Sequence, residues 1–181
     1  MGVVEVIALT MGVAWASGIN LYAAIAVLGI LGTTGNIVLP QDLEVLAHPM
    51  VIGAACFMYC VEFFADKVPG VDSGWDVLHT FIRIPAGAVL AAGAVGQMEP
   101  AVVLAAGILG GALTAGVHAT KAGSRLMINS SPEPVTNWMA SLTEDVVVIV
   151  GLWTALHHPV IFLIVLGVMI VLIIWLLPKI W

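Results

Sequence analysis

The chain has 181 residues, of which 61% are hydrophobic and only 9% are charged, and its formal net charge is -6. A soluble domain carries about 25% charged residues, so this chain has too few charges to solvate a globule of its size. The acidic balance excludes a basic nucleic-acid-binding surface. We therefore expect an integral membrane protein, with the lipid bilayer as its main partner and no nucleic acid.

Apolar segments separated by proline-rich or charged gaps predict about six transmembrane helices, each about 20 residues long. In chain order these segments are 3–34, 49–66, 80–97, 100–123, 138–157 and 159–178. Prolines end helices and favour the gaps between them, as at the loop expected over 130–134. The predicted fold is an all-α polytopic membrane helix bundle that forms a single domain over residues 1–181.

The first segment is too long for a simple crossing. A helix of about 32 residues measures roughly 48 Å, whereas the hydrocarbon core is about 30 Å thick. The small-polar stretch 16–20 (ASGIN) interrupts this segment, and the stretch 114–118 (TAGVH) stands in the same register in the fourth segment. We expect interrupted first and fourth spans that present helix ends, with Ser17, Asn20 and His118, to a substrate.

The matching interruptions suggest a 3+3 inverted repeat with halves 1–98 and 99–181. With three spans in each half, the second half runs opposite to the first, which is the layout of many secondary transporters. The alternative is a chance match, because glycine, alanine and serine are ordinary packing residues in membrane helices.

Two carboxylates close the second segment. Glu62 and Asp66 stand four residues apart and therefore share one helix face. Asp72 and Asp76 follow in the next gap, and clustered oxygen ligands suit a divalent cation such as Mg²⁺ or Ca²⁺. The metal candidates are thus Glu62, Asp66, Asp72 and Asp76. Alternatively, Asp72 caps a short amphipathic helix over 73–82.

The fifth segment carries Glu144 and Asp145 at a depth similar to that of the first acidic pair. A carboxylate at such depth costs about 2.5–3.5 kcal/mol on insertion scales, so four together need protons, a cation or basic partners. One interpretation is a substrate or ion site, and the other is a set of structural salt bridges. The candidate site residues are Glu62, Asp66, Glu144, Asp145, Asn20, His118, Lys121 and Ser17, with Lys67, Arg83 and Arg125 as further partners.

The five basic residues set the expected orientation. If the N-terminus is cytoplasmic and there are six crossings, all five lie on the cytoplasmic side, as the positive-inside rule requires. They are Lys67, Arg83, Lys121, Arg125 and Lys179, and four tryptophans lie near the same boundary: Trp75, Trp138, Trp175 and Trp181. We expect a bacterial inner-membrane protein with both termini in the cytoplasm.

Three motifs resemble those of a bacterial and plant family of integral membrane proteins that is a domain of unknown function. They are 17–23 (SGINLYA), 61–73 (VEFFADKVPGVDS) and 131–138 (SPEPVTNW). The resemblance covers nearly the whole chain and implies no activity. Glu62, Asp66 and Lys67 are also similar to the Glu-x-Gly-Asp-Lys motif of a cation/proton exchanger family, but here the glycine is absent and the spacing is one residue longer.

Our leading functional hypothesis is a small secondary transporter or ion-conducting protein with an intramembrane acidic site for a cation, a proton or a small molecule. The alternatives are a lipid- or quinone-binding protein or metal-dependent enzyme embedded in the membrane, and a structural subunit of a membrane complex. No nucleophile elbow, phosphate loop or metalloprotease motif occurs, so an enzyme is the less favoured class. We leave open whether the protein forms a homo-oligomer.

Overall fold

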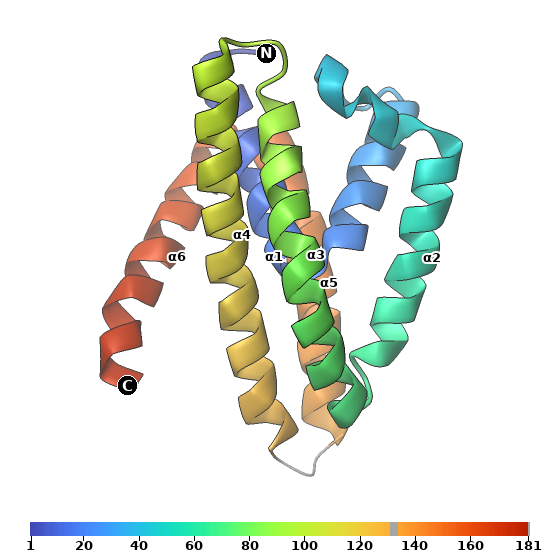
Figure 1. Cartoon of the computed structure of the whole chain (residues 1–181), viewed down its shortest axis with the longest axis vertical. Helices are drawn as coiled ribbons and strands as arrows, with labels where there is room; N and C mark the ends of the chain where they lie inside the picture. Colours follow the sequence, from blue (N-terminus) through green and yellow to red (C-terminus); the bar gives the residue numbers. More distant parts are fainter. Residues whose placement is uncertain (131–133, 181) are drawn as a thin grey trace.

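The computed structural model describes residues 1–130 and 134–180, and most of these residues lie in helices (Figure 1). The α-helices are α1 (Val3–Thr33), α2 (Pro49–Ala65), α3 (Pro69–Ala94), α4 (Pro100–Asn129), α5 (Pro134–His157) and α6 (Pro159–Ile180), and η1 (Gln41–Ala47) is a 3₁₀ helix. No strand occurs in the described residues, which confirms the all-α prediction. The middle of the loop expected over 130–134, the Lys179 side chain and Trp181 lie outside the description.

Proline marks the start of five of the six α-helices. Its fixed φ suits the first helical turn, where its missing N–H would have no intrahelical acceptor anyway. The predicted starts at 49, 100 and 159 are therefore confirmed. The predicted start at 80 is wrong, because Pro69 opens α3 and the short helix expected over 73–82 is the first part of this longer helix. Asp72 accordingly lies in the first turn of α3 rather than at an N-cap.

The helices are those of an integral membrane protein. Four are long and apolar enough to cross a bilayer by length and composition, and the pair η1 and α2, bent by 67°, makes up to five. In α6, the stretch Pro159–Trp175 counts as a shorter apolar helix. Large hydrophobic side chains such as Phe57, Leu104 and Ile164 are exposed on the outer surface. Such a surface suits lipid, because hydrocarbon does not penalise exposed apolar groups.

The helix α1 breaks at Asn20, as the sequence predicts for the first segment. Asn20 has φ -147° and ψ 98°, which are extended rather than helical values. Its side-chain oxygen accepts a hydrogen bond of 2.9 Å from the backbone N–H of Ala23. This is the geometry of an N-cap, in which a side chain satisfies a free N–H of the first turn. The break divides α1 into a first limb (residues 3–19) and a second limb (residues 21–33).

Both limbs of α1 reach the same end of the bundle, so α1 is a re-entrant hairpin with its apex at Asn20 (Figure 1). Glu5 at the start of the first limb lines one groove together with Pro40, which follows the second limb, and with His157 at the end of α5. Farther along the second limb, Gly29 lies against Leu46 of η1. Asn20, at the apex, is buried inside the bundle, where a membrane protein tolerates interrupted helices.

The hairpin changes the expected topology. Because α1 returns to the end where it began, the segments α2 to α6 run between the two ends, and the chain termini lie at opposite ends of the bundle (Figure 1). This arrangement differs from the expectation that both termini face the cytoplasm, and the orientation of each terminus relative to the membrane stays a prediction. Length and composition predict one crossing for this apolar segment, whereas the break at Asn20 turns the chain back toward the end where it began.

The fourth segment is not interrupted. Helix α4 runs continuously through 114–118, which corrects the expected break there. The Thr114 hydroxyl donates to the carbonyl oxygens of Gly110, within α4, and of Ala14, on α1. Thr114 also lies against Gly87 of α3, where a β-carbon would collide with its hydroxyl. The small residues of α4 therefore serve close helix packing. The division into repeat halves stays a prediction.

Candidate functional site

Two stripes of polar side chains run along α3 and α4 and face each other inside the bundle. On both helices the members are spaced by four, three and four residues, which keeps them on one helix face. They are Asp72, Asp76, His79 and Arg83 on α3, and Thr114, His118, Lys121 and Arg125 on α4, all of them buried. Buried polar stripes on two neighbouring helices create a polar interior in a bundle whose outside is apolar.

The ionisable side chains of these stripes meet the acids of α2 and α5 in what we call the charged cluster. Its nine members are Glu62, Asp66, Asp72, Asp76, Arg83, Lys121, Arg125, Glu144 and Asp145. Eight of them are buried, and the Glu144 side chain is 19% exposed. The cluster lies near the ends of α2 and α4 and the start of α3, directly below the apex of the α1 hairpin.

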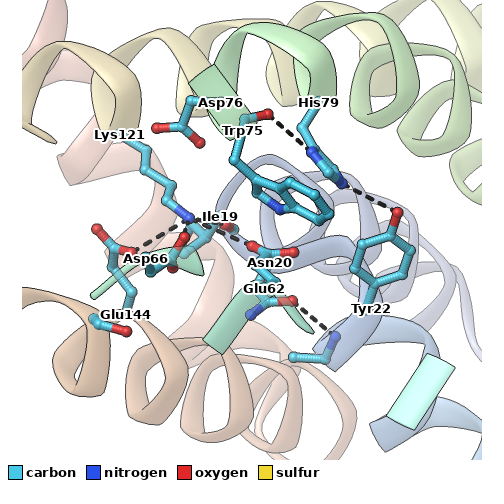
Figure 2. Close-up of polar contacts among 12 residues, drawn as sticks. Ile19, Asn20, Tyr22, Glu62, Asp66, Trp75, Asp76, His79, Lys121 and Glu144 are labelled. Atoms are coloured by element: carbon cyan, nitrogen blue, oxygen red, sulfur yellow. Dashed lines mark hydrogen bonds and ion pairs between the residues drawn. The ribbon is translucent and has the colours of Figure 1, made fainter. Parts of the chain in front are cut away.

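Lys121 stands at the centre of the cluster (Figure 2). Its Nζ donates a hydrogen bond of 3.0 Å to the carbonyl oxygen of Ile19, which the break in α1 leaves without an intrahelical partner. The same Nζ lies 3.4 Å from Glu144 Oε2 and 3.5 Å from both Glu62 Oε1 and Asp66 Oδ2. A cation at the carboxyl end of a helix limb is also favoured by the helix dipole.

Asn20 and Asp145 connect the apex of the hairpin to α5 and α2. The Asn20 amide nitrogen donates to Asp145 Oδ1 at 3.1 Å, and the Tyr59 hydroxyl donates to Asp145 Oδ2 at 3.0 Å. Both carboxylate oxygens of Asp145 are thereby satisfied. Asp145 therefore positions the apex and is a neighbour of the Lys121 centre rather than one of its contacts.

The two arginines of the cluster form close ion pairs. Arg83 donates to Glu62 in a pair with both side chains fully buried, and its second nitrogen lies 3.5 Å from Asp76. Arg125 binds Glu144 through two parallel hydrogen bonds of 2.9 and 2.7 Å. Paired donors of this kind add geometric specificity to the charge attraction. These ion pairs correspond to the structural salt bridges that the sequence analysis gives as the alternative to an ion site. Their acids, Glu62 and Glu144, also face Lys121.

Two buried histidines border the cluster, and their partners assign their protons. His118 Nδ1 lies 3.2 Å from Arg83, which can only donate, so Nδ1 accepts. Its Nε2–H then faces the Thr80 hydroxyl oxygen at 2.8 Å and the Asp76 carbonyl at 3.1 Å. The His118 ring is neutral in this arrangement and adds no positive charge. His79 Nδ1 lies 2.9 Å from the Trp75 carbonyl and therefore donates, and its Nε2 lies 3.1 Å from the Tyr22 hydroxyl.

Carboxyl groups outnumber basic groups in the cluster. Six acids face Arg83, Lys121 and Arg125, and counting Lys67 beside them still leaves an excess of acids. The oxygens Glu62 Oε2, Asp66 Oδ1 and Asp76 Oδ2 are buried and have no hydrogen-bond partner among the described residues. Buried polar atoms without partners are rare in proteins because they cost free energy. These oxygens are where a proton or a cation would be stabilised.

Lys67 lies beside the cluster and contacts no carboxylate within ion-pair distance among the described residues. Its Nζ donates to the Phe63 carbonyl at 2.8 Å and to Ser141 at 3.4 Å. It also stands over the Phe63 ring, which is a cation–π arrangement. Burial lowers the pKa of Lys67, and the negative charges of Asp145 and Asp66 oppose this shift.

The structure brings most of the sequence-predicted site residues together. Glu62, Asp66, Glu144 and Lys121 converge at one point, and Asn20, Asp145 and His118 lie next to it. Ser17 does not join them, because its hydroxyl donates to the Val13 carbonyl of its own limb at 2.6 Å.

The geometry gives the predicted divalent metal site no support. No group of three or more histidine, cysteine or acidic side chains stands ready to hold a metal ion anywhere in the part of the chain that is described. Glu62 and Asp66 face Lys121 instead, and Asp76 faces Arg83. The assignment of Glu62, Asp66, Asp72 and Asp76 as metal ligands stays a prediction.

Some site residues escaped the sequence analysis, although helical spacing marks them. Tyr59 stands three residues before Glu62 on the same face of α2, and Asn137 stands seven residues before Glu144 on α5. Tyr59 binds Asp145, and Asn137 accepts a hydrogen bond from Arg125. Extending the search from charged residues to every polar residue at such spacing finds both.

The chain belongs to the family described as a domain of unknown function (DUF4126), whose model matches residues 7–179. This confirms the resemblance to an uncharacterised family. No curated protein and no solved structure matches the chain.

Proposed function

We propose that this member of the DUF4126 family is a small secondary transporter or ion-conducting membrane protein, whose charged cluster binds a cation or relays protons. The observation that carries the proposal is the excess of buried carboxyl groups directly below a broken helix. Glu62, Asp66 and Asp76 each hold a buried oxygen without a partner among the described residues.

The free-energy cost of burying so many ionisable side chains in a membrane supports a functional role for the charged cluster. Each ionised side chain within the bilayer costs about 2.5–3.5 kcal/mol or more, and such residues mark ion pathways and proton relays in membrane proteins. Transporters place the ends of interrupted helices at their substrate and ion sites. Here the first limb of α1 ends with the Ile19 carbonyl on Lys121, and the second limb begins at Asn20.

The orientation follows from the basic residues under the same proposal. Lys67 lies in the α2–α3 connection, and Arg125 lies one turn before the end of α4, at the same end of the bundle. The positive-inside rule assigns this end to the cytoplasm. The N-terminus then lies on the opposite face of the membrane, which we propose to be a bacterial inner membrane.

Proteoliposome flux tests the function. Purified protein is reconstituted and assayed against a panel of alkali cations, divalent cations, protons and small metabolites. We expect flux of at least one of them, and we expect Glu62→Gln to reduce it at least tenfold because the pair with Arg83 loses its charge. Glu44→Gln is the matched control, since Glu44 is an exposed acid on η1. Flux at the level of empty vesicles across the whole panel would contradict the proposal.

A lipid- or quinone-binding protein is the second candidate, favoured by one groove. The groove has a volume of about 230 Å³ and is lined by apolar residues that include Trp15 and Val147, with Lys121 and Glu144 among its lining residues. An amphiphile could place its chain against the apolar wall and its polar group near Lys121. Native mass spectrometry of the purified protein tests this candidate, and it fails if no lipid or quinone is retained.

A further inference from the structure

We propose that a groove between α4, α5 and α6 binds a single-chain amphiphile with a primary ammonium head group, which enters from the lipid and reaches the charged cluster. The inference rests on the proposed function and deepens it, because it names one class of cation that the cluster takes. Three features support it: the shape of the groove, the order of apolar and polar residues along it, and the hydrogen-bonding groups at its polar end.

Three hollows on the surface of the bundle meet beside α6. The hollow that contains Lys121 and Glu144 has a volume of about 230 Å³, a second of about 370 Å³ lies against α4, and a third of about 420 Å³ lies against α5. Met169 of α6 lines all three, and Val117 and Ile173 line the first two. The α6 ribbon diverges from α4 toward its C-terminal end (Figure 1). The first two hollows therefore form one continuous groove, which we call the α4–α6 groove.

The α4–α6 groove is apolar along most of its length and polar at one end. Its apolar part follows α4 from Leu109 to Val117, and its polar end follows at Lys121 and Ser124. From Leu109 to Lys121 the helix rises about 18 Å, at 1.5 Å per residue. One leaflet contributes half of the hydrocarbon core, which is about 15 Å. The groove thus has the length and the polarity of one chain in one leaflet, with its head group near the end of α4.

The groove is open to the bilayer along its apolar part. Leu109 on α4 is 56% exposed and Ile174 on α6 is 67% exposed, and both line the groove. Exposed apolar side chains in a membrane protein contact lipid chains. A molecule already dissolved in the lipid can therefore enter sideways, and its head group then reaches the cluster without crossing an apolar barrier.

The hydroxyl groups at the polar end of the groove can only accept hydrogen bonds from a ligand. Thr120, Ser124 and Thr143 each donate to a backbone carbonyl of their own helix, at 2.8, 2.7 and 2.7 Å. A hydroxyl has one hydrogen and two lone pairs, so what each of them presents to the groove is acceptor capacity. This end of the groove therefore favours a head group that donates N–H bonds.

The charges at the polar end favour a cation over an anion. Glu144 lines the groove and is the most exposed acid of the charged cluster, and Arg125 occupies two of the about four lone-pair positions of its carboxylate. Lys121 Nζ already faces the Ile19 carbonyl and three carboxylates, which are more acceptors than its three hydrogens can satisfy. A phosphate or carboxylate head group would lack a donor here and would meet a cluster in which acids exceed bases.

A primary ammonium group matches this end better than other cations. Its three N–H donors fit the acceptors of Glu144, Thr120 and Thr143. A quaternary ammonium group has the same charge but no N–H to donate, and an alkali cation has no chain for the apolar part. The α4–α6 groove therefore specifies both the chain and the head group of its ligand.

Photoaffinity labelling in phosphatidylcholine nanodiscs tests the site. The probe is a long-chain primary amine with a diazirine in its chain, and peptide mass spectrometry locates the label. We expect label on residues of α4 and α6 that line the groove, displaced by dodecylamine at least tenfold more effectively than by dodecanol or dodecyltrimethylammonium. Equal displacement by all three would mean that the groove reads only the chain, which contradicts the proposal. Dodecanoate or phosphatidylethanolamine as effective as dodecylamine would also overturn it, in favour of an anion or a phospholipid.

A filled groove should take no label. Gly116 lines the apolar part of the groove, and a β-carbon there meets no atom within 4 Å. We expect Gly116→Phe to reduce the labelling at least tenfold. Gly123→Phe is the matched control, because Gly123 is another exposed glycine of α4 with no atom within 4 Å of an added β-carbon, and it lies outside the groove. Equal labelling of the two variants would place the amine elsewhere and refute the site.

Two variants on α5 test the head group. Glu144→Gln removes the exposed negative charge, and we expect dodecylamine to displace the probe at least tenfold less effectively, with dodecanol unaffected. Thr143→Val keeps the inference testable if Glu144→Gln does not fold, since it removes one acceptor from an exposed side chain of similar size, and we expect a twofold to fivefold weakening. Thr154→Val is its control, because Thr154 is also exposed on α5 and also donates to its own helix. Unweakened dodecylamine in every variant that folds would overturn the assignment of the head group.

The two proposals fail in different ways. Labelling confined to the α4–α6 groove, without flux of any ion or amine in proteoliposomes, keeps the site and overturns the transport function. Flux that depends on Glu62, together with labelling that does not differ between Gly116→Phe and Gly123→Phe, keeps the function and overturns this inference.

Discussion

Asn20 has two roles at the apex of the hairpin, and both depend on its amide group. The amide oxygen caps the second limb at Ala23, and the amide nitrogen binds Asp145 on α5. Aspartate would keep the cap but would place a second carboxylate against Asp145. Serine would keep the cap and lose the bond to Asp145. Asparagine is therefore suited to joining the break in the helix to the charged cluster.

We predict that Asn20→Ala destabilises the protein by about 2–3 kcal/mol, because it removes an N-cap bond and leaves the Asp145 carboxylate one donor short. Asn20→Ser should cost about half as much, since a hydroxyl can cap Ala23. Denaturant unfolding in detergent, followed by circular dichroism, measures both. Equal stability of wild type and Asn20→Ala would contradict the role of the apex bonds.

The fully buried pair of Glu62 and Arg83 should behave as a coupled unit. Arg83→Met leaves the buried Glu62 carboxylate with only the longer contact to Lys121 and should cost about 3–5 kcal/mol. Glu62→Met leaves Arg83 with only the longer contact to Asp76 and should cost a similar amount. The double variant should cost much less than the sum, because it leaves no lone charge from this pair. A double-mutant cycle on unfolding free energies measures the coupling. Additive costs would mean that the two side chains do not stabilise each other.

The contacts of the candidate site could be anticipated only in part from the residues. Helical spacing predicts that Glu62 and Asp66 share a face, and their depth in the membrane requires basic partners. Which base faces which acid depends on how four helices are rotated about their axes, and no local pattern encodes that rotation. Ser17 illustrates the limit, because a small polar residue next to the break bonds its own helix instead.

At the scale of elements, α1 and α4 show how similar sequences give different backbones. Both contain a small residue, a glycine, a β-branched residue and a polar residue in the same order. In α1 the polar residue is asparagine, whose short side chain can cap a new helix, and Asp145 holds it in place. In α4 it is His118, which points to Arg83 and Asp76 on α3 and leaves the backbone helical. The break depends on tertiary partners.

The seam between α3 and α4 should tolerate no added volume. A β-carbon on Gly110 would collide with Ala91 of α3, whereas one on Gly116 of the same helix would meet no atom within 4 Å. We predict that Gly110→Val costs about 1–3 kcal/mol or prevents folding, because the helices must separate. Gly116→Val is the control and should change stability by less than about 1 kcal/mol. Similar unfolding midpoints for the two variants would contradict the close packing.

At the scale of the whole molecule, the number of α-helices and most of their boundaries could be predicted, because prolines and polar gaps are strong local signals. The topology could not, because length and apolarity do not distinguish a crossing segment from a hairpin. The excess length of the first segment was the available signal. A break at its centre allows two half-length limbs as readily as one bent crossing, and packing against α3, α4 and α5 decides between them.

Cysteine labelling in spheroplasts tests the topology. In a background with Cys56→Ala and Cys60→Ala, single cysteines at Gly2 and Asn36 should react with a membrane-impermeant reagent from one side, and one at Ser130 from the other. The hairpin predicts that the first two positions share a side, because both lie at the same end of the bundle as Pro40. Labelling of Gly2 and Asn36 from opposite sides would show that α1 crosses the membrane.

The central claim is that the charged cluster below the hairpin moves cations or protons, and one measurement tests it most directly. Internal pH and alkali-cation content are recorded together in proteoliposomes after an outward proton gradient is imposed. Cation–proton exchange through the charged cluster predicts proton efflux coupled to cation uptake in wild type and in Glu44→Gln, with both lost in Glu62→Gln. Identical traces from wild type, Glu62→Gln and empty vesicles would contradict it.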